Sequence, residues 1–324
     1  MKKIVAITTG GTIAMKLDPC TGGLIPAVSG KDLLDAVPAL KDIAEIEVVE
    51  QSNIPSGHMT PAMMLDLSRK IDELAKDDSI AGFVVTHGTD TLEETAYLLD
   101  LTLHTEKPVC VTGAMRGASD TSWDGPGNIL AAVKTAACDA AVGQGVLVVL
   151  NDTIHAAGEV TKTHSVNTAT FASPWWGAVG HVYFDKVVFR RKPIARQKIQ
   201  PEKLVPDVYL LKCVAGMDDF LFRCLIEKKI KGLVVEAFGC GNVPPGVRAG
   251  ILAVRRARIP VVLATRVYGG RVVPCYSYTG SAGEMLSSGI ILAGELNGQK
   301  ARLKLMLALG LTDDNEKLKE YFKP

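Results

Sequence analysis

Short uncharged runs rich in valine and isoleucine recur through the first half of the chain, and each run leads into a polar turn. Such runs are typical of parallel strands that are buried on both faces. Between the runs, apolar residues recur at helical spacing. The pattern predicts strands at 4–8, 43–49, 83–86, 109–112 and 146–150, and helices at 31–40, 61–76, 92–99 and 127–139. Strands that alternate with helices in this way predict a doubly wound, mostly parallel sheet.

The alternation stops at residues 151–189, which are polar and irregular, as expected of hairpins at the edge of a domain. Residues 191–207 are basic and contain three prolines, which indicates a linker. The alternation then returns, with strands expected at 208–212, 232–237 and 261–264, helices at 218–227, 245–256, 299–309 and 314–321, and a glycine-rich segment at 268–289. The sequence therefore predicts a larger N-terminal α/β domain at 1–190 and a smaller C-terminal α/β domain at 208–324.

A length of 324 residues agrees with this division, because chains of that size usually form about two domains. The net charge is +1, from 36 basic and 35 acidic side chains. A balance so close to neutral favours neither nucleic acid nor an anionic membrane surface as a partner. No run approaches the roughly 18 apolar residues of a membrane span.

The seven cysteines are scattered and include no CxxC pair, so we expect reduced thiols and no zinc site. The apolar run at the N-terminus is too short for a signal peptide and continues directly into a glycine-rich turn. It is better interpreted as the first strand. These features together predict a cytoplasmic protein.

Polar residues gather where two of the predicted strands end. Strand 83–86 runs into His-Gly-Thr-Asp-Thr at 87–91, and strand 4–8 runs into Thr-Gly-Gly-Thr at 9–12. In open α/β sheets, ligands bind at the carboxyl ends of the strands. A helix cap explains one hydroxyl, but not four polar side chains around one glycine. The glycines match neither GxGxxG nor a Walker loop, so a nucleotide site is not favoured.

The polar side chains of these turns favour acyl transfer from an amide or ester. A threonine hydroxyl is a weak nucleophile until a base activates it. A lysine next to Thr89, oriented by Asp90, would complete a triad, and Lys162 is the candidate. Backbone N–H groups of the glycine turns would stabilise an oxyanion. The alternative interpretation of Lys162 is a solvated lysine. No His, Cys, Asp and Glu spacing suggests a catalytic metal.

The stretches TGGTIA at 9–14 and HGTDTLEETA at 87–96 resemble the two signature stretches of the bacterial-type L-asparaginases. The stretches 159–164 and 171–174 resemble further motifs of that family, and the similarity extends from residue 4 to about 309. The resemblance implies hydrolysis of L-asparagine to L-aspartate and ammonia through an acyl-enzyme, without a cofactor. It also implies a homotetramer or homodimer in which the neighbouring subunit completes each site.

The resemblance assigns roles residue by residue. Thr12 matches the nucleophile, and Thr89, Asp90 and Lys162 match the catalytic triad. Asp90 also matches the contact to the substrate α-amino group. The remaining substrate contacts implied are Ser56, Gly57, Gly88, Ala114 and, from the adjacent subunit, Asn242.

The chain departs from the family pattern in the lid and at two substrate contacts. Residues 18–30 contain three glycines and two prolines and are expected to form a mobile loop or lid. Many members carry a tyrosine there that activates the first threonine, whereas residues 15–30 contain none and Leu24 lies near the matching place. Gly57 replaces a common glutamine, which leaves only a backbone N–H for the substrate carboxylate.

The acidic residue that the adjacent subunit usually supplies has no clear match. Glu284 is a candidate, with Tyr276 and Tyr278 as substitutes. His87 is interpreted as a structural support of its strand end. Two further functions stay open: a glutaminase-asparaginase, and a non-catalytic amino-acid sensor that keeps the pocket.

Overall fold

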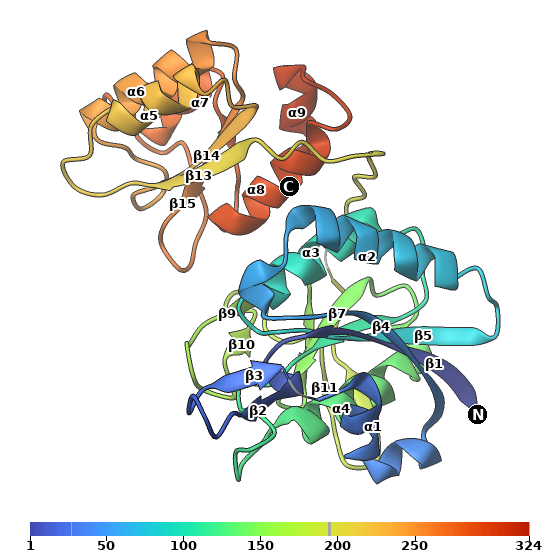
Figure 1. The fold of residues 1–324 in the computed structure, drawn as a ribbon. Helices are drawn as coiled ribbons and strands as arrows, with labels where there is room; N and C mark the ends of the chain where they lie inside the picture. Colours follow the sequence, from blue (N-terminus) through green and yellow to red (C-terminus); the bar gives the residue numbers. More distant parts are fainter. Residues whose placement is uncertain (27, 194–195, 324) are drawn as a thin grey trace. The chain divides into compact units, whose positions relative to one another are not determined.

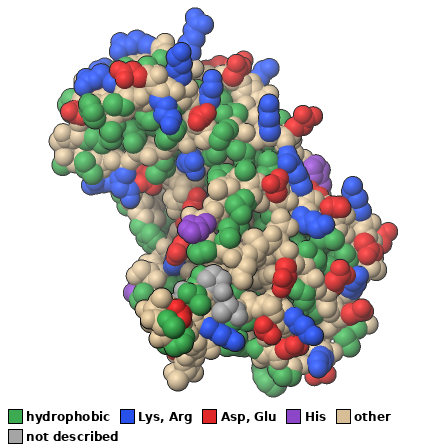
Figure 2. Space-filling view, viewed as in Figure 1, with side chains coloured by type: hydrophobic (Ala, Val, Ile, Leu, Met, Phe, Trp, Pro, Cys, Tyr) green, Lys and Arg blue, Asp and Glu red, His purple; other side chains and the backbone are tan. Residues whose placement is uncertain are grey.

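The computed structural model describes residues 1–26, 28–193 and 196–323. They form two compact units, unit 1 at 1–198 and unit 2 at 199–324. In each unit, helices pack on both faces of a sheet that is mainly or wholly parallel (Figure 1). Figure 2 shows acidic and basic side chains intermingled over the visible face. Within the described residues, no helix combines the length and apolar character needed to cross a bilayer.

The sheet of unit 1 has eight strands, of which five are parallel. In spatial order the parallel strands are β7 (Val146–Leu150), β6 (Val109–Thr112), β5 (Ile80–Thr86), β1 (Lys2–Gly10) and β4 (Ala44–Ile54). Beyond β7 the sheet continues with antiparallel strands β8 (Thr153–Ala156), β11 (Gly180–Val182) and β12 (Val187–Phe189). The predicted doubly wound, mostly parallel sheet is confirmed.

The order of the parallel strands reverses between β1 and β5. From β1 the chain first adds β4 on one side, and then returns to place β5 on the other side. Thr8 of β1 pairs with Thr86 of β5, so both strands end at the same level. Ligands of open α/β sheets bind in the crevice where the strand order reverses. The two polar turns found in the sequence follow these two strands.

Helices α2 (Pro61–Leu74) and α3 (Leu92–Thr102) cover one face of the sheet, while α1 (Gly30–Asp35) and α4 (Gly125–Ala136) cover the other (Figure 1). Side chains of a strand alternate between these two layers. In β5, Phe83 and Val85 pack with α2 and α3, whereas Val84 packs with α4. Both layers are apolar, which explains why the central strands carry no charge.

Several boundaries differ from the prediction. The expected helix 31–40 is divided into α1 and a 3-10 helix, η2 (Pro38–Asp42), because Pro38 cannot donate the hydrogen bond that a continuous helix requires. Strand β4 extends to Ile54 since it pairs with β1 as far as Gly10. Helix α3 is longer than expected, and α4 ends at Ala136 before another 3-10 helix, η4 (Asp139–Ala141).

The segment expected as an irregular lid is partly ordered. Strands β2 (Met15–Leu17) and β3 (Leu24–Pro26) form a hairpin. Its turn is held by Asp18, whose carboxylate accepts hydrogen bonds from Cys20 N and Thr21 Oγ1. Residues 151–189 contain the expected edge hairpins, and also a separate pair, β9 (Thr161–Lys162) with β10 (Phe171–Ala172).

Unit 2 contains a four-stranded parallel sheet in the order β13 (Val208–Lys212), β14 (Gly232–Ala237), β15 (Val261–Thr265) and β16 (Ile291–Leu292). Its helices are α5 (Phe220–Glu227), α6 (Pro245–Arg256), α7 (Ala282–Ser287), α8 (Gly298–Ala308) and α9 (Asn315–Tyr321). The predicted C-terminal α/β unit is confirmed. Two short elements were missed: α7, inside the glycine-rich segment, and β16, just after it.

Candidate active site

The turns after β1 and β5 touch each other through two glycines. A Cβ atom on Gly11 would lie 2.2 Å from Gly88 Cα, closer than any side chain allows. Gly11 also has a φ of 87°, a backbone conformation that favours glycine. Each glycine is followed directly by a threonine, Thr12 at the start of the 3-10 helix η1 (Thr12–Ala14) and Thr89 after β5. The fold thus brings together two turns that are 77 positions apart in the sequence.

Lys162 joins the side chains of the second turn. Its Nζ donates hydrogen bonds to Thr89 Oγ1 at 2.9 Å and to Asp90 Oδ1 at 2.8 Å. The lysine side chain is 17% exposed and that of Asp90 is 75% exposed. Lys162 is therefore a partly buried bridge between a hydroxyl and a carboxylate, and the interpretation as a solvated lysine does not fit.

Strand β9 brings Lys162 to this place. β9 pairs with β10, where Lys162 stands opposite Phe171, and the Phe171 side chain is buried in the core of unit 1. The chain after β9 is held to the residue before β10 by Thr163, whose N–H and Oγ1 both donate to the Thr170 carbonyl. Lys162 therefore extends from a hairpin whose strands are held together by backbone and side-chain hydrogen bonds.

Ser56 lies against the same turns. It begins a 3-10 helix, η3 (Ser56–His58), that follows β4. Its Oγ accepts a hydrogen bond from the Asp90 N–H at 3.2 Å, and its carbonyl oxygen accepts one from Thr91 Oγ1 at 2.8 Å. A Cβ on Gly88 would lie only 2.6 Å from Ser56 Oγ, whereas a Cβ on Gly57 would meet no atom within 4 Å. The serine is therefore packed against the site, and Gly57 has open space beside it.

Ala114 is fully buried in the turn after β6. The preceding residue, Gly113, packs so closely on this site that a Cβ there would lie 2.4 Å from the His87 carbonyl oxygen. Two residues that sequence reasoning missed hold the turn. Asp124 accepts hydrogen bonds from the N–H groups that follow Ala114, and Asn128 Nδ2 donates to the Gly113 carbonyl at 2.9 Å. Their only sequence signal was their position at the start of a helix.

His87 supports the turn at 87–91 through hydrogen bonds of its ring, as predicted. Its ring is buried, with Nδ1 2.7 Å from the Gly88 carbonyl oxygen and Nε2 2.9 Å from Thr95 Oγ1. A carbonyl oxygen only accepts, so Nδ1 carries the proton and Thr95 donates to Nε2. Burial lowers the pKa of His87 to about 4, so the ring is neutral and cannot titrate as a base near pH 7.

The remaining candidates belong to unit 2. Glu284 forms a bidentate ion pair with Arg248, and its carboxylate also accepts a hydrogen bond from Gly280 N at 2.6 Å. These contacts lower the pKa of Glu284 to about 2. Tyr276 and Tyr278 are exposed, with their ring centroids 5.5 Å apart. Asn242 lies in the turn after β14, and its N–H donates to the Phe238 carbonyl.

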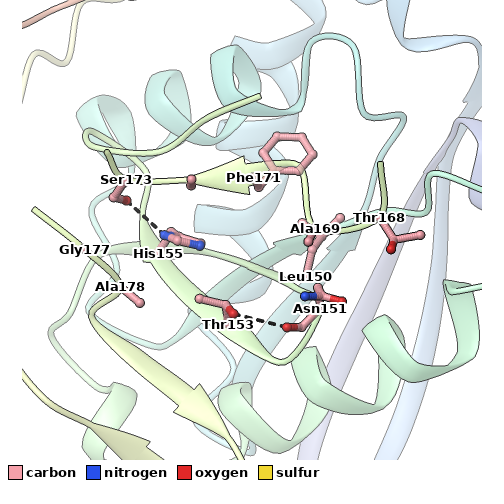
Figure 3. Close-up of a pocket in the computed structure, with 11 residues that line it drawn as sticks. Leu150, Asn151, Thr153, His155, Thr168, Ala169, Phe171, Ser173, Gly177 and Ala178 are labelled. Carbon is pink, nitrogen blue, oxygen red and sulfur yellow. Dashed lines mark hydrogen bonds between the residues drawn. The ribbon is translucent and has the colours of Figure 1, made fainter. Parts of the chain in front are cut away.

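A cavity of about 280 Å³ opens beside β8 and β10 (Figure 3). His155 lies in its wall, with Nδ1 3.0 Å from Ser173 Oγ. Burial is the largest of the effects that lower the pKa of His155 to about 4. None of Thr89, Asp90 and Lys162 belongs to the described lining of this cavity. It is thus not the site of the hydroxyl–lysine–carboxylate cluster.

The hairpin of β2 and β3 contains no tyrosine, and the side chain of Leu24 lies outside the described part of the chain. The described residues include no cluster of three or more His, Cys, Asp or Glu side chains placed to hold a metal ion. The chemistry that the site offers therefore comes from Thr12, Thr89, Lys162 and Asp90 and from backbone groups of the glycine turns. A doubly wound sheet that brings a hydroxyl, an ammonium group and a carboxylate together where its strand order reverses is typical of an α/β enzyme.

Comparisons with known proteins identify the family. Residues 3–195 match the family described as "Asparaginase, N-terminal", and residues 207–322 match the "Glutaminase/Asparaginase C-terminal domain". An L-asparaginase of Bacillus licheniformis is 36% identical over 308 residues, 95% of each chain. A probable L-asparaginase of Deinococcus radiodurans is 38% identical over 328 residues, 99% of this chain and 97% of the relative.

The solved structures agree. The crystal structure of a probable cytoplasmic L-asparaginase from Campylobacter jejuni superimposes with a TM-score of 0.90, at 36% identity and with 99% of both chains covered. The chain belongs to the bacterial-type L-asparaginase family.

Proposed function

We propose that this protein hydrolyses L-asparagine to L-aspartate and ammonia. The observation that carries the proposal is the Lys162 bridge between Thr89 and Asp90, next to the turn that bears Thr12. The names of the relatives support the same substrate.

In the first step, the hydroxyl of Thr12 attacks the side-chain carboxamide of the substrate. A new C–O bond forms, the C–N bond breaks, and the proton of the hydroxyl leaves with ammonia. Thr12 is suited to this role because, among the described residues, its half-buried hydroxyl makes no hydrogen bond that would occupy it. Backbone N–H groups of the glycine turns stabilise the oxyanion that develops.

In the second step, water cleaves the acyl-enzyme and returns the proton to Thr12. The Thr89–Lys162–Asp90 cluster moves protons in both steps. Lys162 reaches the Thr89 hydroxyl directly, and Asp90 fixes the orientation of the lysine.

Polar groups around the crevice orient the amino acid. Asp90 pairs with the α-amino group, since its carboxylate is largely exposed beside the bridge. Ser56 Oγ and the N–H of Gly57 bind the α-carboxylate, and the carbonyl of Ala114 accepts from the carboxamide. Gly88 lets Ser56 approach closely enough for this arrangement.

We also infer the assembly and the location. Asn242 reaches the site of a neighbouring subunit in a homotetramer or homodimer. Within each chain, a catalytic domain at 1–190 and a linker at 191–207 precede the C-terminal domain, and the enzyme acts in the cytoplasm. Sedimentation of the purified enzyme tests the assembly, and a monomer with full activity would contradict the shared site.

Ammonia release from L-asparagine tests the reaction. We expect Thr12→Ala, Thr89→Val and Lys162→Met each to lower kcat on the order of 10³-fold or more, because each removes a group of the reacting chain. Lys134→Met is the matched control, since Lys134 is a half-buried lysine of α4 whose Nζ contacts the carbonyl and the ring of Phe184 and none of the site residues. Mass spectrometry of enzyme quenched during turnover should find the acyl group on Thr12. Undiminished turnover in both threonine variants would end the proposal.

A glutaminase-asparaginase is the second candidate, since the family that residues 207–322 match is described as the "Glutaminase/Asparaginase C-terminal domain". One methylene changes binding in a pocket by only about 1–3 kcal/mol. The ratio of kcat/KM for asparagine and glutamine decides between the two. A ratio near one identifies the broader enzyme, and binding of asparagine without turnover identifies a sensor.

A further inference from the structure

Two cysteines of unit 2 face each other although no disulfide joins them. Cys240 lies in the turn after β14, Cys275 lies in the segment before α7, and their Sγ atoms are 3.3 Å apart. A disulfide requires about 2.05 Å between the sulfurs, so each needs to move by well under 1 Å. Cys275 is exposed and Cys240 is half-buried.

Backbone hydrogen bonds already hold the two segments in register. The N–H of Val273 donates to the Cys240 carbonyl at 2.9 Å, and the N–H of Val243 donates to the Gly280 carbonyl at 2.8 Å. Gly241 packs so closely on this segment that a Cβ there would lie 2.6 Å from a methyl group of Val272. The approach of the two sulfurs is therefore built into the packing.

The other cysteines lack this arrangement. Cys110 and Cys213 are buried, and burial raises the pKa of both thiols. Cys138 is half-buried near Cys110, and no sulfur–sulfur contact between these two is found among the described residues. Cys20 and Cys224 are exposed, but within the described residues neither has a second sulfur in contact. Only a vicinal pair can convert a reactive sulfenic acid into a disulfide within the chain.

We propose that Cys240 and Cys275 form a modification site, at which hydroperoxides oxidise the pair to an intrachain disulfide that small thiols reduce again. The exposed sulfur of Cys275 reacts first. Its thiolate attacks the peroxide, the O–O bond breaks, and Cys275 sulfenic acid and an alcohol or water are formed. Cys240 then attacks that sulfur, a second water leaves, and the disulfide is complete. Burial and the contact with Cys275 raise the pKa of Cys240, which fits its role as the second thiol.

Oxidation of the pair would affect Asn242, which lies in the same turn as Cys240. Its Nδ2 donates to Cys240 Sγ at 3.9 Å, and its Oδ1 is buried without a partner among the described residues. Oxidation changes the sulfur that this amide contacts and ties the turn covalently to the segment that carries Tyr276. If Asn242 acts as inferred above, which rests on the proposed function, the disulfide will also change kcat/KM.

The test uses the full-length reduced protein treated with hydrogen peroxide. Free thiols are then alkylated in denaturant, and the digest is analysed by mass spectrometry. We expect a cross-linked peptide pair containing Cys240 and Cys275, and free thiols falling from the seven of the sequence to five. Dithiothreitol should restore all seven. Oxidation of Cys20 or Cys224 without this cross-link would overturn the proposal.

Serine variants sharpen the result. Cys240→Ser and Cys275→Ser should each abolish the cross-link, whereas Cys224→Ser, at an exposed single cysteine, should leave it intact. A cross-link that persists in Cys240→Ser would contradict the assigned pair. If a serine variant fails to fold, the mass spectrometry of the wild-type digest still decides whether Cys240 and Cys275 are cross-linked. A cross-link in a protein that never releases ammonia would refute the proposed function and leave the disulfide established.

Discussion

Gly11→Ala should separate the two turns of the active site. The added methyl group would lie 2.2 Å from Gly88 Cα and 2.3 Å from Gly88 N, and both of these are backbone atoms that cannot rotate away. Carbon atoms pack best at about 3.5–4.0 Å. The turns that carry Thr12 and Thr89 must therefore move apart by roughly 1.3 Å or more.

The expected losses follow from that displacement. A shift of about 1 Å between reacting groups can cost about 10²-fold in rate. Alanine at the φ of 87° and ψ of 179° of Gly11, a region that essentially only glycine adopts, adds roughly 1–3 kcal/mol of backbone strain. We thus expect kcat/KM for asparagine to fall by at least about 10²-fold, with a loss of stability of a few kcal/mol.

Ammonia release well below the melting temperature, with urea unfolding of the same samples, measures both effects. Gly127→Ala is the matched control, because Gly127 is an exposed glycine of α4 whose Cβ would meet no atom within 4 Å. Better helix propensity should raise the stability of that variant by a few tenths to about 1 kcal/mol, with no change in kcat/KM. A Gly11→Ala enzyme within about twofold of wild type would refute the close contact of the turns.

Two further predictions concern buried titratable groups. Burial lowers the pKa of Lys304 to about 8, so the unfolded chain binds more protons between pH 8 and about 10.4, and wild-type stability should rise with pH across that window. Lys304→Met should remove this dependence of stability on pH and raise the free energy of unfolding at pH 7 by about 2–3 kcal/mol, measured by urea titration. The same pH dependence in wild type and variant would contradict the role of Lys304. The neutral His87 also makes stability rise with pH, because the unfolded chain binds the additional proton between pH 4 and 6.5. The free energy of unfolding should therefore fall by up to about 3 kcal/mol as the pH is lowered from 6.5 to 4. His87→Gln should weaken this loss, and equal acid profiles for both proteins would exclude His87 as its source.

The sequence predicts the central strands well because each is buried on two faces. Phe83 and Val84 point into opposite apolar layers, so neither tolerates a charge, and the run stands out in the sequence. Elements at the edge give a weaker signal. Strand β16 has only two residues, and Pro38 interrupts a pattern that otherwise reads as one helix.

The candidate site was predictable only in part. The hydroxyls and the carboxylate were visible as polar strand ends, and Lys162 was a candidate from residue chemistry whose triad role the resemblance also implied. The supports were not visible, because Asp124 and Asn128 act through hydrogen bonds to a turn at the end of another strand. The ion pair that occupies Glu284 joins residues 36 positions apart, which no local pattern reveals.

The order of the strands decides which polar ends can act together. Every parallel strand of unit 1 ends at the same edge, so the turns after β4, β1 and β5 all meet there. β1 and β5 are neighbours because the chain reverses its direction of winding between them, and the pairing of Thr8 with Thr86 makes the two strands end level. Had β5 paired outside β4, Gly11 and Gly88 would lie two strands apart, and the direct contact between their backbones would be lost. The catalytic role assigned to the two threonines therefore depends on topology, and the contact between the two glycines is its most direct structural expression.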